Sequence, residues 1–269
     1  MQSQLRGLSA ALIYFVALLI LAFILAPLIA PVIIAFSDGI IVAFPPQRFS
    51  LRWFTKVLAD EEFLAALAFS ARLAAAVTVL ALALGLPCAF GLARRRFPGR
   101  DAMMALIMAP LIFPVLVTGL ALLQFFTALG SRNTFLHLVI GHTVIAIPYV
   151  VRTAAASIVL VDEAIEDAAR TLGATRLCTF LFITLPQIRQ GIIAGAVFSF
   201  VTSFDDYSLS MWLADAANFP LPLQIHVFIQ RFFDPSVAAI STLMILFSMM
   251  LMLLIERGMG LSVKRLVTT

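Results

Sequence analysis

Long apolar stretches alternate with shorter polar ones along most of this 269-residue chain. A bilayer core of about 30 Å needs roughly 20 apolar residues in a helix, so each long stretch is a candidate membrane span. The runs are continuous, unlike the alternating pattern of outer-membrane strands. Six spans are predicted, in chain order Leu8–Phe36, Phe63–Leu92, Ala102–Ala128, Leu136–Ala156, Gln190–Leu213 and Val237–Ile255. The pattern therefore predicts an all-α membrane protein with one transmembrane domain, residues 1–269.

One polar segment, residues 161–189, is much longer than a simple connection between two helices needs. At its start, Asp162 is a favourable N-cap, and Glu163 and Glu166 fall in the first turn, where the helix dipole stabilises anions. Glu166 and Arg170 form a favourable i,i+4 pair, and Gly173 suits the position just after a helix. The segment is therefore expected to begin with one short helix that ends at Gly173.

The rest of this segment predicts a second short element and a docking face. A further turn or two over Thr175–Phe182 is expected to end at Ile183–Pro186, because proline disrupts a helix interior. The first helix carries a narrow apolar stripe of Ile165, Ala168 and Leu172. The small residues Ala168 and Ala169 permit close approach of another surface. The segment is thus a predicted two-helix elbow. Its alternative interpretation is a solvated loop that only covers the ends of the bundle.

Composition supports the membrane interpretation and gives the chain an orientation. The chain is 62% hydrophobic and 12% charged, against roughly 45–50% and 25% in soluble domains. Placing both termini, the Arg94–Arg96 loop and the elbow on one side puts twelve of the 18 lysines and arginines there. Basic residues mark the cytoplasmic side, so we expect both termini in the cytoplasm. The net charge of +4 then needs no nucleic-acid partner.

Candidate residues for a translocation pathway lie in the third and fifth predicted spans. Asp205 and Asp206 are unusual because an acid facing lipid costs up to about 2.5–3.5 kcal/mol at the bilayer centre. Either this pair faces the bundle interior or external water and attracts a cation, or the span ends early and the pair is a solvated helix end. Pro110 and Pro114 break the third span, as in helices that line cavities. Gln124 on the same span is a further candidate.

Other kinds of site are not expected. The three histidines are scattered without an i,i+4 pair or a cysteine partner, which argues against a metal site. Neither of the two lysines, Lys56 and Lys264, follows the glycine of a phosphate-binding Walker loop. No G-x-S-x-G motif occurs, and adjacent acids such as Asp205 and Asp206 point about 100° apart on a helix, which suits a catalytic dyad poorly. We therefore expect no catalytic residue, no metal and no cofactor in this chain, with any ATP and Mg²⁺ bound by a separate subunit.

The elbow contains a recognisable spacing of residues. It reads Asp167-Ala168-Ala169, three residues, Gly173, nine residues, and then Ile183-Thr184-Leu185-Pro186. This resembles the EAA signature of ABC importer permeases, E-A-A-x3-G-x9-I-x-L-P, with Asp167 in place of the glutamate. Segments such as FPPQRFSLRWF, GHTVIAIPYVVRT and SFDDYSLSMW are similar to the spermidine/putrescine type, and most similar to the second of its two permeases.

The resemblance implies a type I importer permease of the bacterial inner membrane. In that family the elbow is a coupling helix seated in a groove of an ATPase subunit. The implied partners are two ATP-binding subunits, a second and distinct permease, an extracytoplasmic solute-binding protein and the lipid bilayer. The residues expected to act in coupling are Asp162, Glu163, Glu166, Asp167, Ala168, Ala169, Gly173, Leu185 and Pro186.

The resemblance also implies import of a small cationic solute, a polyamine such as spermidine or putrescine. Another small solute remains open, including an opine, an amino-acid-like amine, a phosphonate or a metal-chelate. A self-contained channel or secondary transporter is the rival from another class. Secondary transporters usually contain two halves with matching broken helices, whereas this chain has one proline-broken span without a clear counterpart. An intramembrane hydrolase is disfavoured by the missing catalytic motifs.

Overall fold

The computed structural model describes residues 2–41, 44–46, 48–232 and 234–259, with side chains described between residues 12 and 250 of these ranges. The described chain is helical, apart from one isolated bridge between Ser37 and Phe49. It divides into two compact units. One is built on residues 2–61 and 225–249, and the other on residues 62–224. The single permease domain expected from the sequence stays a prediction.

Four described helical segments are long and apolar enough to cross a bilayer. They include α1 (Gln2–Ala35), α3 (Glu61–Arg94) and α6 (Thr134–Val159), which correspond to the first, second and fourth predicted spans. The fourth segment, Arg176–Phe204, contains the fifth. α12 (Ser236–Met259) occupies the position of the sixth prediction, but its apolar part with described side chains, Ser236–Met250, is shorter than a span.

The third predicted span is not one kinked helix. It consists of α4 (Arg100–Ile112) and α5 (Val115–Ala128), whose axes are bent by 103°. Phe113 is extended, with φ −74° and ψ 142°, a conformation favoured by the following proline, whose ring disfavours the helical region for the residue before it. Pro114 is the cap residue of α5, whereas Pro110 lies within α4 without ending it. The pair therefore counts as a broken span or a re-entrant loop, which makes five spans at most among the described helices.

The fifth predicted span has both of its ends in the wrong place. Residues 176–204 form α8 (Arg176–Thr179), a π-helical turn η1 (Phe180–Thr184) and α9 (Leu185–Phe204) without a break. The prediction that Ile183–Pro186 ends the helical segment is therefore wrong, because the helix continues through Pro186. This proline lies in the first turn of α9, where a missing backbone N–H costs little, and the Leu185 N–H donates instead to the Phe180 carbonyl five residues earlier. At the other end, α9 stops at Phe204 and not at Leu213.

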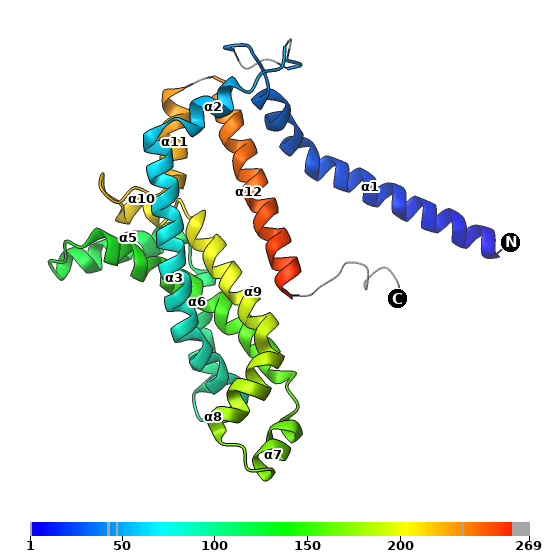
Figure 1. Cartoon of the computed structure of the whole chain (residues 1–269), viewed down its shortest axis with the longest axis vertical. Coiled ribbons are helices and arrows are strands. Elements are labelled where there is room, and N and C mark those ends of the chain that lie inside the picture. Colours follow the sequence, from blue (N-terminus) through cyan, green and yellow to red (C-terminus); the bar gives the residue numbers. More distant parts are fainter. Residues whose placement is uncertain (1, 42–43, 47, 233, 260–269) are drawn as a thin grey trace. The chain divides into compact units, whose positions relative to one another are not determined.

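The larger unit is organised around α6, and it ends with the first part of α11 (Leu221–Arg231). α6 and α9 lie side by side over most of their lengths (Figure 1). Their contact depends on Gly191 and Gly195, because a Cβ on Gly191 would lie 2.6 Å from the Thr153 carbonyl oxygen and one on Gly195 would lie 3.1 Å from the Val150 Cα. Small residues four apart are the usual device for close helix packing in membranes. The buried residues around α6 include Leu73, Val77, Leu138, Ala146, Val150, Val151, Ala154 and Ile188.

The smaller unit contains α1, the short helix α2 (Arg52–Leu58) and most of α12. From Leu12 to Ile34 the described side chains of α1 are exposed or half-buried, and Ala35 at its end is buried. α2 is attached to the start of α12 by Lys56, whose Nζ lies 2.7 Å from Asp234 Oδ2 and 4.6 Å from the centre of the Phe232 ring.

Candidate functional site

The elbow begins with α7 (Glu163–Thr171), which has the caps expected from the sequence. Asp162 is the N-cap, and its Oδ1 accepts the Ala164 N–H at 2.9 Å. At the other end Gly173 has φ +92°, and its N–H donates to the Arg170 carbonyl. A left-handed residue just after a helix favours glycine, since other side chains are strained there. The predictions that Asp162 caps the start of this helix and that Gly173 follows its end are therefore confirmed.

Glu166 is the buried carboxylate of the elbow, with only 4% of its surface exposed. Arg94, at the end of α3, donates two hydrogen bonds to it, from Nη1 to Oε2 at 2.7 Å and from Nη2 to Oε1 at 2.9 Å. The Thr184 hydroxyl in η1 donates to the same Oε1 at 2.6 Å. The hydrogen bonds from Arg94 hold the pKa of Glu166 below its ordinary value, against the opposing effect of burial. The sequence analysis predicted a pair between Glu166 and Arg170. In the structure Arg170 Nη2 lies 4.0 Å from Glu166 Oε2, farther than Arg94.

The neighbouring acids of α7 face outward. The side chains of Glu163 and Asp167 are 70% and 73% exposed. Asp167 Oδ1 accepts from Arg170 on the same helix at 3.4 Å. The predicted apolar stripe is also exposed, with Ile165 at 49% and Leu172 at 89%. α7 therefore presents a surface of mixed acidic and apolar character that the described part of the chain leaves uncovered.

The remaining residues assigned to the elbow have different surroundings. Ala168 is exposed, and Ala169 is half-buried. Leu185 and Pro186 begin α9 and are half-buried and exposed, respectively. They belong to the span that continues from the elbow and not to its outward face.

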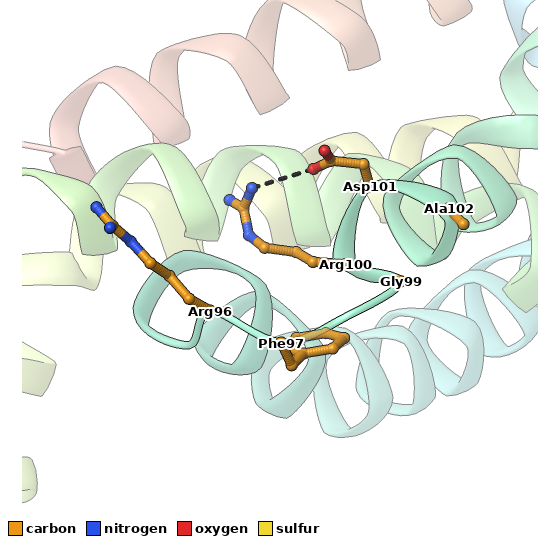
Figure 2. Close-up of a pocket in the computed structure, with 6 residues that line it drawn as sticks. All are labelled: Arg96, Phe97, Gly99, Arg100, Asp101 and Ala102. Atoms are coloured by element: carbon orange, nitrogen blue, oxygen red, sulfur yellow. Dashed lines mark hydrogen bonds and ion pairs between the residues drawn. The ribbon is translucent and has the colours of Figure 1, made fainter.

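The arginine loop between α3 and α4 is far from the elbow in sequence, but Arg94 at its start contacts Glu166 of the elbow. Arg100 Nε donates to the Leu92 carbonyl at 2.7 Å, which satisfies an acceptor near the end of α3. Arg100 also pairs with Asp101, and both line a hollow of about 350 Å³ (Figure 2). Arg95 and Arg96 are exposed, whereas Arg94 is half-buried against Glu166. Adjacent arginines of one run therefore have different roles, which composition alone does not reveal.

Asp205 and Asp206 lie in the turn that follows α9. Asp205 is the C-cap of α9 and is exposed. Asp206 Oδ2 accepts the N–H groups of Leu209 at 2.8 Å and Ser210 at 3.2 Å, at the start of α10 (Ser210–Leu213). The helix thus ends before Asp205, as one part of that alternative had it, whereas Asp206 is half-buried and has a capping role. Whether either acid meets a solute stays a prediction.

The other three pathway candidates lie in the broken pair. Pro110 is half-buried, and Pro114 and Gln124 are exposed. Part of this pair lies next to the turn after α9, because a Cβ on Gly119 of α5 would lie 3.1 Å from the Leu209 Cα.

A buried histidine fixes this turn and was missed by the sequence analysis. His142 of α6 is fully buried, with Nδ1 3.0 Å from Ser203 Oγ and Nε2 3.2 Å from Ser210 Oγ. The two serines flank the Asp205–Asp206 turn, so one imidazole contacts both sides of it. The sequence did not predict this contact, because Ser203 and Ser210 are 61 and 68 residues away from His142. They meet it only because α6 packs on α9.

Comparisons with known proteins now bear on this arrangement. Residues 63–267 match the model of the binding-protein-dependent transport system inner membrane component family. The putrescine transport system permease protein PotI of Escherichia coli K12 is 31% identical over 237 residues, which cover 86% of this chain and 84% of that protein. A probable molybdenum ABC transporter permease protein of Haloferax volcanii is 35% identical over 158 residues, 56% of this chain and 58% of that protein.

Among solved structures, a bacterial ABC transporter involved in the import of the acidic polysaccharide alginate has a similar fold. Its TM-score is 0.69 at 15% identity, over 96% of this chain and 97% of that chain. At this identity the likeness concerns the fold alone. The family match covers most of the chain, including the elbow and the turn after α9. The chain therefore belongs to the family of binding-protein-dependent transport system inner membrane components, the non-catalytic permease subunits of ABC importers.

Proposed function

We propose that α7 is the coupling element through which ATP hydrolysis by a partner drives this permease. In the family, ATP is bound by a separate ATPase subunit, so the permease needs a rigid element that both proteins engage. The observation that carries the proposal is the elbow itself. α7 is capped at both ends, is held from the inside by Glu166, and presents Asp167 and Leu172 to solvent. A rigid-body motion imposed on such an element would be passed on to the spans.

The proposed assembly follows from this assignment. Two ATPase subunits lie in the cytoplasm, each engaging one permease, and a second, distinct permease completes the pathway. A solute-binding protein delivers the solute from the outside. In this arrangement α12 completes six spans of a type I permease, and both termini are cytoplasmic, in agreement with the excess of lysine and arginine on the elbow side.

For the solute we propose a small organic cation of the polyamine class. The 31% identity to a putrescine permease supports this class, as does the exposed carboxylate of Asp205 beside the break between α9 and α10. A second candidate is a different small solute, and the 35% identity over 158 residues to a probable molybdenum permease favours it. Competition of unlabelled putrescine, spermidine and molybdate for uptake by the reconstituted importer distinguishes the two candidates.

Charge reversal on the outward face tests the coupling assignment. In the reconstituted complex, Asp167→Lys is expected to reduce the stimulation of ATP hydrolysis by the loaded binding protein at least about tenfold, a coupling loss within the usual allosteric range. The matched control is Asp101→Lys, since Asp101 is 97% exposed and lies on α4 outside the elbow. Stimulation of the Asp167 variant equal to that of the control would show that α7 does not couple the two subunits.

A further inference from the structure

We infer that Arg94 and Thr184 are positioning residues that join the coupling element to two membrane helices through the carboxylate of Glu166. Arg94 ends α3, Glu166 lies in α7, and Thr184 lies in η1 directly before α9. Three elements therefore meet at one side chain. This inference rests on the proposed coupling role of α7, and it names the contacts by which movement of α7 reaches the rest of the chain.

The geometry of the contact is that of a rigid joint. Both oxygens of Glu166 are used, Oε2 by Arg94 Nη1 and Oε1 by Arg94 Nη2 and the Thr184 hydroxyl. Two parallel hydrogen bonds from one guanidinium fix orientation as well as distance. A lysine offers only a single point charge on a flexible chain and would not fix the orientation in the same way.

Burial makes this joint costly to open. Glu166 is 4% exposed, and if Arg94 moved away its buried charge would keep only the Thr184 hydroxyl at 2.6 Å and Arg170 at 4.0 Å as partners. α7 is therefore expected to move together with the end of α3 and the start of α9. By contrast, the contact of Asp167 with Arg170 lies within α7 and transmits nothing to the spans.

The adjacent acids Glu166 and Asp167 thus have different roles in the elbow. Successive residues on a helix point about 100° apart, which directs Glu166 into the protein and leaves Asp167 73% exposed. Glu166 cannot reach a partner subunit without losing its hydrogen bonds to Arg94 and Thr184. Of these two acids, Asp167 is the one available to the ATPase, and Glu166 is the one that holds α7 on its own chain.

The π-helical turn places Thr184 where this joint needs it. η1 spans Phe180–Thr184, and the Thr184 hydroxyl lies 2.6 Å from Glu166 Oε1. π-helical turns within α-helices often occur at functional positions. Here the turn directs a hydroxyl toward α7 at the point where the elbow continues into α9.

The test measures solute transported per ATP hydrolysed in the purified, reconstituted complex, with putrescine as the probe solute. Arg94→Gln is expected to lower this ratio about tenfold or more, because coupling free energies are commonly worth that much. Arg94→Lys should recover part of the loss, and the reversed pair Arg94→Glu with Glu166→Arg should recover more. The matched control is Arg95→Gln, since Arg95 is the exposed neighbour in the same run. A residue with only a structural role would lower the amount of assembled complex and leave the ratio per complex unchanged.

An unchanged ratio in assembled Arg94→Gln complexes overturns the inference. If that variant fails to assemble, Thr184→Val decides the question, since it removes one hydroxyl at nearly constant volume. A lowered ratio then supports the joint, and a ratio equal to that of the wild type overturns it. The result is separable from the coupling role of α7. Loss of coupling in Asp167→Lys together with a normal ratio in Arg94→Gln would refute the joint alone. Normal coupling in Asp167→Lys with a low ratio in Arg94→Gln would refute the outward docking face alone.

Discussion

At the scale of single residues, Glu166 links charge state to the attachment of the elbow. Its pKa is lowered mainly by the hydrogen bonds from Arg94, so the carboxylate is more stable as an anion in the folded protein than in the unfolded chain. A group with a lowered folded-state pKa contributes stability above its unfolded pKa, and loses that contribution as the pH falls through the folded value. The contribution of Glu166 is therefore complete at neutral pH and decreases below its ordinary pKa of 4.5.

This sign gives a prediction for Glu166→Gln. Removing one charge of a buried pair costs about 3–5 kcal/mol at neutral pH, and the difference from the wild type should shrink as the pH falls below about 4.5. Thermal unfolding of the purified complex at pH 7 and at pH 4 measures both values. The control is Asp167→Asn, since its side chain is 73% exposed and surface changes usually stay within about 0.5 kcal/mol. A difference that grows toward pH 4 would mean that the ionised form is not the one that the fold stabilises.

At the scale of elements, the close packing of α6 on α9 predicts which glycines can be replaced. Gly191→Ala places a methyl group against the backbone of Thr153, 2.6 Å from its carbonyl oxygen, and overpacking of this kind costs about 1–3 kcal/mol. Gly91 of α3 is the control, because no atom lies within 4 Å of an added Cβ there. In thermal unfolding, Gly191→Ala should lower the midpoint and Gly91→Ala should not. Equal midpoints would mean that the two helices separate easily at this point.

The elements also show which parts of the fold follow from sequence. The caps Asp162 and Gly173 were predicted correctly, because capping depends on a few neighbouring residues. Two of the wrongly predicted boundaries, at Phe113 and at Asp205, have a different origin. Hydropathy changes little across Phe113, yet the helix breaks there. At Asp205 and Asp206 the apolar stretch is interrupted but resumes after them, so the prediction continued the span through a turn. The first break follows from a proline ring, and the second is accompanied by long-range contacts of His142.

In the candidate site, too, some features could be predicted from local sequence and others depend on long-range contacts. The spacing of the EAA-like residues located the elbow, but it treated Glu166 and Asp167 as equivalent acids. Only the folded chain separates them, since Arg94 and Thr184 reach Glu166 from 72 and 18 residues away in sequence. Periodicity along one helix predicts which residues share a face. It does not predict which face the rest of the protein covers.

At the scale of the whole molecule, the turn after α9 gives the most direct test of which solute the permease transports. An exposed acid such as Asp205 can attract a cation, whereas Asp206 already accepts two backbone N–H groups. Asp205→Asn should therefore weaken uptake of radiolabelled putrescine, with an increase in the half-saturating concentration of about tenfold, or about 1.4 kcal/mol. Asp206→Ala should mainly lower thermal stability, by about 1 kcal/mol for the lost capping hydrogen bonds.

Asp38→Asn is the control, because Asp38 is an acid in the loop after α1 whose side chain is 44% exposed. Uptake measured at low and at high ionic strength adds a second criterion, since attraction by an exposed charge is screened by salt. The wild type should lose affinity as salt increases, while Asp205→Asn should change less. If Asp205→Asn and Asp38→Asn have the same uptake and the same salt dependence as the wild type, the turn after α9 is structural. The cation would then have to be selected elsewhere in the assembly.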